Sequence, residues 1–287
     1  MSALNRFTFL STSVFSTSVF STSALALGLG LVLSLTTGGC QQPQSYCTTA
    51  HGDFATTYTL TSGDPQSACG GLKGEVLGLQ TYYAKGGANG TPKFSEPSMA
   101  IRPATLGELI DRAGSSDPAI VDPNAEPNAL AKFTAGLPDD EEFCAATKFS
   151  VSEITLPELP LIPGDPDDPQ TPENEGTPDI PPYPATNIRY EWSNARVLVS
   201  ANYQGTQFSA DLKFTQDGCT AEYEVRGLYP LIGCALDAEC CSTEEDCRGK
   251  GEDGADLPLS GINPDFDVRC DTGLGYCVLR GDIPALR

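Results

Sequence analysis

Residues 188–226 read IRYEWSNARVLVSANYQGTQFSADLKFTQDGCTAEYEVR, and this stretch decides the fold. Apolar and polar residues alternate along four runs within it, at 188–192, 197–203, 207–214 and 219–226. Alternation with a period of two is typical of strands that bury one face. Between the last two runs, Asp217-Gly218 is a dipeptide that favours a two-residue hairpin turn. The stretch therefore predicts an antiparallel meander.

Upstream of the meander, three segments are rich in aromatic and β-branched residues and predict further strands, at residues 54–60, 72–83 and 143–154. Two short helices are expected between them. Residues 105–108 (TLGE) have the pattern of a capping box, and Asp122-Pro123 is expected to begin a second helix that ends near Gly136. A few strands cannot bury an apolar face alone. We therefore predict a mainly β domain over residues 51–230, either an antiparallel β-sandwich or a barrel-like sheet.

Residues 157–184 differ from the rest of this domain. They hold ten of the 23 prolines and seven acidic residues, with no lysine or arginine. Proline cannot donate to a strand ladder, and so polar a segment has little to bury. We expect an extended, solvated stretch that forms neither ladder nor core. A long loop within one domain is favoured, and a linker between two domains is the alternative.

Residues 231–287 contain six cysteines in the pattern C-x5-CC-x5-C-x22-C-x6-C, among glycine, aspartate and short apolar runs. We expect a disulfide-stabilised extension, because so short a segment has too little core of its own. Zinc is disfavoured, since its sites prefer gaps of about two to four residues, and no metal or cofactor is assigned. The sequence fixes no pairing among the ten candidates for disulfides, which are Cys47, Cys69, Cys144, Cys219, Cys234, Cys240, Cys241, Cys247, Cys270 and Cys277.

The N-terminus has the pattern of an export signal. Residues 24–35 read ALALGLGLVLSL, a run of apolar and small residues that suits the core of a signal peptide. The run is too short to span the roughly 30 Å of hydrocarbon in a bilayer. We therefore expect residues 1–39 to be a signal peptide.

Small residues lead directly into Cys40, and here the sequence resembles the lipobox of bacterial lipoproteins. Gly38 and Gly39 occupy the small positions, whereas Thr37 stands where the lipobox usually has leucine. The resemblance implies a lipid on the sulfur of Cys40, which would become the new N-terminus and bind the membrane. In Gram-negative lipoproteins, a residue such as Gln41 after the cysteine implies sorting to the outer membrane. Residues 40–50 would form a flexible tether, and a secreted form without lipid is the alternative.

The composition and missing motifs bound the function. The chain has 38 acidic and 17 basic residues and a formal net charge of −21, which opposes binding to nucleic acid. His51 is the sole histidine and no G-x-S-x-G motif is present, so H-E-x-x-H proteases are excluded and no catalytic residue is assigned. Trp192 lies on the alternating face, where core packing is favoured over a ligand pocket.

These observations favour a membrane-anchored lipoprotein with a non-catalytic binding, adhesion or envelope-structural role. Two alternatives remain open. The first is a hydrolase outside the cytoplasm that acts through paired carboxylates. The second is a cysteine-rich inhibitor or partner-binding module formed by residues 231–287.

Overall fold

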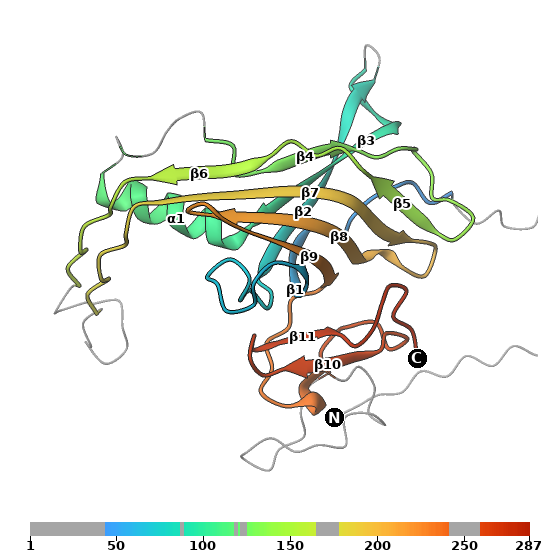
Figure 1. Cartoon of the computed structure of the whole chain (residues 1–287). Coiled ribbons are helices and arrows are strands. Elements are labelled where there is room, and N and C mark those ends of the chain that lie inside the picture. Colours follow the sequence, from blue (N-terminus) through green and yellow to red (C-terminus); the bar gives the residue numbers. More distant parts are fainter. Residues whose placement is uncertain (1–43, 87–88, 118–119, 121–124, 165–177, 241–258) are drawn as a thin grey trace, which may run out of the picture. The chain divides into compact units, whose positions relative to one another are not determined.

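The computed structural model describes residues 44–86, 89–117, 120, 125–164, 178–240 and 259–287. Nine strands form one antiparallel sheet in the order β4-β3-β2-β1-β9-β8-β7-β5, and β6 also pairs with β7 (Figure 1). These strands are β1 (Gly52–Ser62), β2 (Val76–Gly86), β3 (Thr91–Pro103), β4 (Ala129–Lys132), β5 (Phe143–Ala146), β6 (Ser152–Leu156), β7 (Thr186–Val199), β8 (Gln204–Gln216) and β9 (Cys219–Leu228). The remaining elements are the helix α1 (Ala104–Ser116), the short 3-10 helix η2 (Asp237–Cys240) and a second sheet of β10 (Val268–Asp271) and β11 (Tyr276–Leu279).

The two ends of the large sheet approach each other. The amide of Ser150 donates to the carbonyl of Leu130 at 2.9 Å, and the amide of Thr134 donates to the carbonyl of Ala145 at 2.8 Å. These bonds join the β4 end of the sheet to the β5 and β6 end. The result is an antiparallel, nearly closed, barrel-like sheet, which confirms the predicted mainly β fold in its barrel-like form.

The hairpin turn predicted between the last two strands of the meander is confirmed. Asp217 and Gly218 have φ angles of 51° and 84°, and the flanking residues Gln216 and Cys219 are paired in register. Positive φ at both central positions is what a type I′ turn requires.

One of the predicted strands is divided in the structure. The runs at 188–192 and 197–203 lie along one strand, since β7 continues through the first and into the second until Val199 and absorbs the break as a register shift after Ser193. Conversely, residues 143–154 form two strands, β5 and β6, rather than one. A bulge can keep a strand continuous where the alternation slips, and alternation alone does not reveal it.

The second predicted helix is also wrong, and the described residues contain one α-helix. Residues 121–124 lie outside the description, and β4 occupies 129–132, where a helix was expected. β4 pairs with the segment 98–101 of β3 and buries Ala129 and Ala131. Pairing with the long neighbouring strand outweighs the preference of these four residues for a helix.

One core fills the interior of the sheet. Helix α1 contributes Leu106, Leu109 and Ala113 to it, and Trp192 packs there with 4% of its surface exposed, as expected. The proline-rich segment also enters this core, since Leu159 is fully buried. Leu159 and Tyr183 form an antiparallel bridge. The expectation that residues 157–184 form neither ladder nor core is therefore wrong for their two ends, while residues 165–177 lie outside the description.

The C-terminal segment has a small core of its own and docks on the barrel. Its core includes Phe266, which is 1% exposed. The side chain of Gln207 on β8 makes a reciprocal pair of hydrogen bonds with the backbone of Ala285, at 3.2 and 2.9 Å. Gln207 is itself fully buried, so this pair satisfies an amide that would otherwise lack partners.

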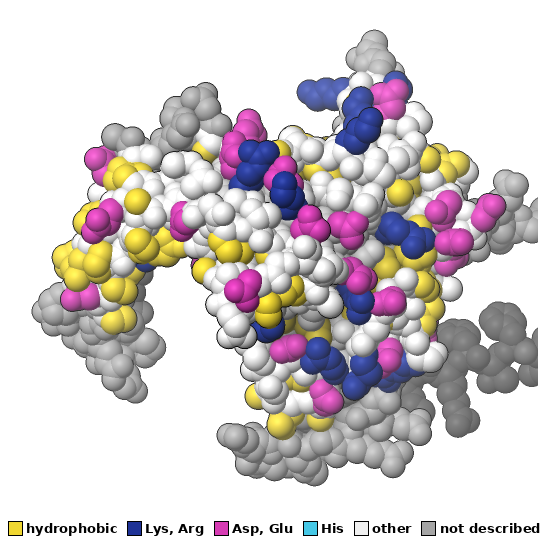
Figure 2. All heavy atoms as spheres, viewed as in Figure 1, with side chains coloured by type: hydrophobic (Ala, Val, Ile, Leu, Met, Phe, Trp, Pro, Cys, Tyr) yellow, Lys and Arg dark blue, Asp and Glu magenta, His cyan; other side chains and the backbone are white. Residues whose placement is uncertain are grey.

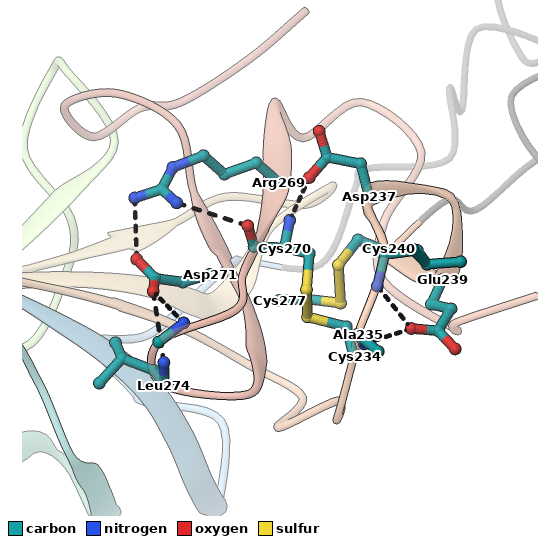
Figure 3. The surroundings of a disulfide bond; sticks show 12 residues. Cys234, Ala235, Asp237, Glu239, Cys240, Arg269, Cys270, Asp271, Leu274 and Cys277 are labelled. Atoms are coloured by element: carbon teal, nitrogen blue, oxygen red, sulfur yellow. Dashed lines mark hydrogen bonds and ion pairs between the residues drawn. A yellow bond between two sulfur atoms is a disulfide. The ribbon is translucent and has the colours of Figure 1, made fainter.

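Four disulfides cross-link the described residues. They join Cys47 to Cys144, Cys69 to Cys219, Cys234 to Cys270 and Cys240 to Cys277. The last two lie side by side in the C-terminal segment, where Asp237 accepts a hydrogen bond from the amide of Cys270 at 2.6 Å (Figure 3). The candidates Cys241 and Cys247 lie outside the described residues.

Candidate functional site

The carboxylate of Glu75 is the centre of a polar cluster inside the barrel. Its Oε1 accepts hydrogen bonds from the hydroxyls of Tyr58 on β1, at 2.8 Å, and Tyr190 on β7, at 2.9 Å. Its Oε2 accepts from Thr105 in the first turn of α1, at 2.9 Å from the hydroxyl and 3.3 Å from the backbone amide. One side chain thus ties together two strands and the helix.

The backbone before β2 places Glu75 in this position. Gly74 has a φ of 153°, and a Cβ atom there would lie 2.0 Å from the carbonyl oxygen of Thr56. The Thr56 hydroxyl in turn donates to the carbonyl of Glu75 at 2.6 Å. Only glycine permits this approach, so Gly74 brings the chain against β1 and points the next side chain inward.

Removal from water changes the pKa values of the ionisable side chains in this cluster. Desolvation raises the pKa of Glu75 above its usual range, and the hydrogen bonds from Tyr58, Thr105 and Tyr190 offset part of that rise. Burial also holds the pKa values of Tyr58 and Tyr190 well above 10.0, with the nearby Glu75 charge as the second cause. Both phenols therefore stay protonated and act as hydrogen-bond donors.

This cluster caps the helix in a way that the sequence does not predict. The capping box expected at residues 105–108 is wrong, because Pro103 is the N-cap and no side chain of the helix caps it, and Glu108 is exposed. Glu75 takes over instead, receiving the Thr105 amide near the positive end of the helix dipole. The groups that donate hydrogen bonds to Glu75 are hydroxyls and one amide. Because they come from two strands and from α1, the arrangement fixes α1 in the barrel. It does not supply the paired carboxylates that the hydrolase alternative needs.

A groove on the outer face of the sheet is the candidate binding site. Its volume is about 710 Å³, within the range of small-molecule sites. The registers of β2, β3 and β4 place Tyr82 beside Ser98 and Ala100 beside Leu130. The groove is lined by Tyr82, Ser98, Ala100, Glu126, Asn128, Leu130, Ala131, Lys132 and Lys148.

The groove combines exposed apolar surface with positive charge. Tyr82 and Leu130 are 50% and 48% exposed. Lys132 and Lys148 also line it, and neither forms an ion pair within the described part of the chain. Glu126 is the one acidic residue of the lining. Two unpaired lysines beside an apolar floor suit a ligand with an anionic head and an apolar body.

The residues singled out by sequence do not line the groove. Cys40 lies outside the described residues, and eight of the ten disulfide candidates are the paired cysteines described above. Within the described residues, one cluster has the spacing of a metal site, the Sγ atoms of Cys234, Cys240 and Cys270, which lie within 4.8 Å of one another. All three sulfurs are in disulfides, whereas a metal ligand must be a free thiolate.

Sequence comparison relates the barrel to known proteins. Residues 52–230 match the family model described as MlpA. A protein of Myxococcus xanthus with the name "Putative lipoprotein MlpA" is 30% identical, over 88% of this chain and 93% of that relative. No solved structure matches. The family match begins at the first residue of β1 and ends just after β9, so it spans all nine strands of the barrel.

Proposed function

The chain belongs to the MlpA family, and from that premise we propose that it is an exported lipoprotein of the outer membrane whose barrel binds an amphipathic anion. In this proposal residues 1–39 are the signal peptide, and Cys40 carries the lipid at the head of the tether. The tether expected over residues 40–50 is shorter than that, because Cys47 is disulfide-bonded to Cys144 and Thr49 is buried against the barrel. The barrel follows, with the cysteine-rich segment of residues 231–287 docked on it. The role is binding, not catalysis.

The anchor is supported by the lipobox-like residues before Cys40 and by the name of the Myxococcus xanthus relative. A multiply acylated cysteine of the bacterial lipoprotein type gives a lasting anchor, since one chain binds only marginally and several bind stably. Within the described residues, no helix is long and apolar enough to cross a membrane.

The Cys40→Ala protein is expected to leave the membrane fraction entirely, because the lipid has no other attachment point in this proposal. The measurement is flotation of native vesicles, followed by intact mass spectrometry of the floated protein. Wild type should float and carry the mass of the lipid on Cys40. The matched control is Ser45→Ala, which changes a nearby residue of the tether and should float like wild type. Equal flotation of the Cys40→Ala protein would refute the anchor.

The single observation that carries the binding role is the groove with two unpaired lysines in a chain of net charge −21. Elsewhere on this surface acidic and basic side chains are interspersed, as Figure 2 shows. Some cations on the barrel are paired with acidic neighbours, as Arg189 is with Glu153 and Glu191, whereas others form no ion pair within the described residues. Lys132 and Lys148 are two of these others, and what distinguishes them is that both line the same groove.

The double variant Lys132→Glu/Lys148→Glu is expected to lose binding of an amphipathic anionic probe. The probe is 8-anilinonaphthalene-1-sulfonate, whose fluorescence reports entry into an apolar site. Reversal of two charges beside a sulfonate should weaken binding by at least about tenfold, or about 1.4 kcal/mol. Lys73→Glu is the matched control, because Lys73 is exposed and does not line the groove. Equal loss in that control, or unchanged binding in the double variant, would contradict the proposal.

A further inference from the structure

Aromatic rings are exposed where the described part of the chain begins. Tyr46 stacks on Phe94 of β3 with 5.0 Å between ring centroids, and Tyr83 of β2 packs edge-on against the same ring at 5.0 Å. Tyr46 is 37% and Phe94 40% exposed. The Tyr83 hydroxyl donates to the carbonyl of Cys47 at 3.2 Å. The rings therefore sit on a rigid base next to the Cys47–Cys144 disulfide, yet remain open to an outside partner.

These rings lie at the base of a projecting hairpin. The outer ends of β2 and β3 extend beyond the rest of the sheet (Figure 1), since β4 pairs only with residues 98–101 of β3. Residues 91–96 of β3 are all exposed. A strand pair that projects in this way has no core of its own to bury and is free to contact another surface.

The hairpin has one more basic than acidic residue in a strongly acidic chain. Residues 76–97 contain Lys85, Lys93 and Glu96, and the protein has a net charge of −21. Lys93 forms an ion pair with Glu96, so Lys85 supplies the excess positive charge. Figure 2 shows basic side chains on the projecting part of the molecule, with an acidic side chain among them. Lysines flanking aromatic rings are typical of surfaces that meet anionic headgroups, where the rings enter the interface and the ammonium groups reach the phosphates.

The length of the tether limits how far this surface can lie from the membrane. Tyr46 is the sixth residue after Cys40. Six residues span at most about 22 Å even when fully extended. If Cys40 is held in the bilayer, the backbone of Tyr46 must lie within that distance of Cys40, and the ring of Phe94 lies beside that of Tyr46.

We propose that Tyr46, Phe94 and the lysines of the β2–β3 hairpin form a membrane-facing surface that rests on anionic lipid and orients the barrel. The inference depends on the proposed lipid on Cys40, which sets the distance. The lipid keeps the protein at the membrane, and the hairpin decides which side of the barrel faces it. The groove lined by Lys132 and Lys148 is then presented at a fixed angle to the bilayer.

The test is amine footprinting of the full lipidated protein on vesicles of phosphatidylcholine with phosphatidylglycerol, read by mass spectrometry. Labelling of Lys85 and Lys93 should fall several-fold relative to the Cys40→Ala protein mixed with the same vesicles. Lys213 on β8, whose side chain is 50% exposed, is the internal control and should label equally in both. Protection should shrink when phosphatidylglycerol is omitted.

A pair of matched variants tests the rings. Phe94→Ser should still float with the vesicles but lose the protection of Lys85 and Lys93, whereas Leu236→Ser should keep it. Leu236 is 50% exposed in the C-terminal segment, so the two variants change comparable exposed apolar residues. Failure of the wild type to float would overturn the anchor. Flotation with full labelling of Lys85 and Lys93 would overturn this inference and leave the anchor standing.

Discussion

Replacing Cys69 and Cys219 by alanine together is expected to lower the free energy of unfolding by about 5 kcal/mol. The disulfide between them closes a loop with a sequence separation of 150, the longest of the four. A cross-link over so long a loop removes much of the conformational freedom of the unfolded chain. Equilibrium unfolding in guanidinium chloride, under oxidising conditions for all proteins, measures the change.

The control for this prediction is the double alanine variant of Cys234 and Cys270, whose separation is only 36. The same reasoning gives a loss smaller by about 1 kcal/mol. A loss from the short loop that equals or exceeds that from the long one would show that loop length does not set the stabilisation in this protein.

Glu75→Leu is expected to cost about 3 to 5 kcal/mol of unfolding free energy. The substitution removes the acceptor for the hydroxyls of Tyr58 and Tyr190, which are 6% and 1% exposed, and for the Thr105 amide. Buried donors left without a partner cost far more than the net value of a hydrogen bond. The matched control is Glu108→Leu on α1, the helix that Glu75 holds, since Glu108 is exposed and its replacement should change stability by less than about 0.5 kcal/mol.

The variant Glu75→Gln removes the charge of this side chain and keeps its shape. The amide oxygen still accepts from Tyr58 and Tyr190, whereas its nitrogen meets the Thr105 backbone amide, which is also a donor. Because the folded state raises the pKa of Glu75 above its usual 4.5, the folded protein binds this proton more tightly than the unfolded chain does. The stability from Glu75 is therefore complete below about pH 4.5 and is lost as pH rises through the raised folded-state value.

The measurable consequence is a difference between two pH profiles. As the pH rises above about 4.5 and through the raised folded-state pKa of Glu75, wild type should lose stability relative to Glu75→Gln. A constant difference across this range would mean that Glu75 titrates alike in the folded and unfolded states. The difference profile is the useful quantity, because the many other carboxylates contribute equally to both proteins.

Much of the sheet follows from local patterns, and the remainder depends on distant partners. The Asp217-Gly218 turn can be predicted because two adjacent residues determine it. Strand β3 has no such signal: Pro92 and Pro97 interrupt it, and Pro97 is accommodated opposite Tyr83, where the β2–β3 register shifts. β4 becomes a strand only because β3 is beside it.

The candidate sites could be predicted from local sequence patterns even less well than the strands. Nothing near Glu75 in the sequence marks it as a partly buried acid. Its partners Tyr58, Thr105 and Tyr190 lie 17, 30 and 115 residues away. The groove brings Tyr82 on β2 together with Lys148, which lies between β5 and β6. The Ser150–Leu130 hydrogen bond joins that connection to β4, and no local spacing of basic residues marks it. By contrast, the disulfide-forming cysteines could be recognised from their number and pattern, and eight of them are paired in the described residues. The lipid on Cys40 stays a prediction.

The pairing of β1 with β9 has a consequence for the timing of folding. These central strands are neighbours in the sheet but lie at opposite ends of the barrel sequence, Ala55 facing Leu228. Contacts this distant form slowly, and none can form before the last barrel strand has left the ribosome. The disulfide between Cys69 and Cys219 likewise waits for an oxidising compartment. For a chain exported as proposed, the barrel would stay open, and thus threadable through a translocation pore, until both of its ends had reached the far side of the membrane.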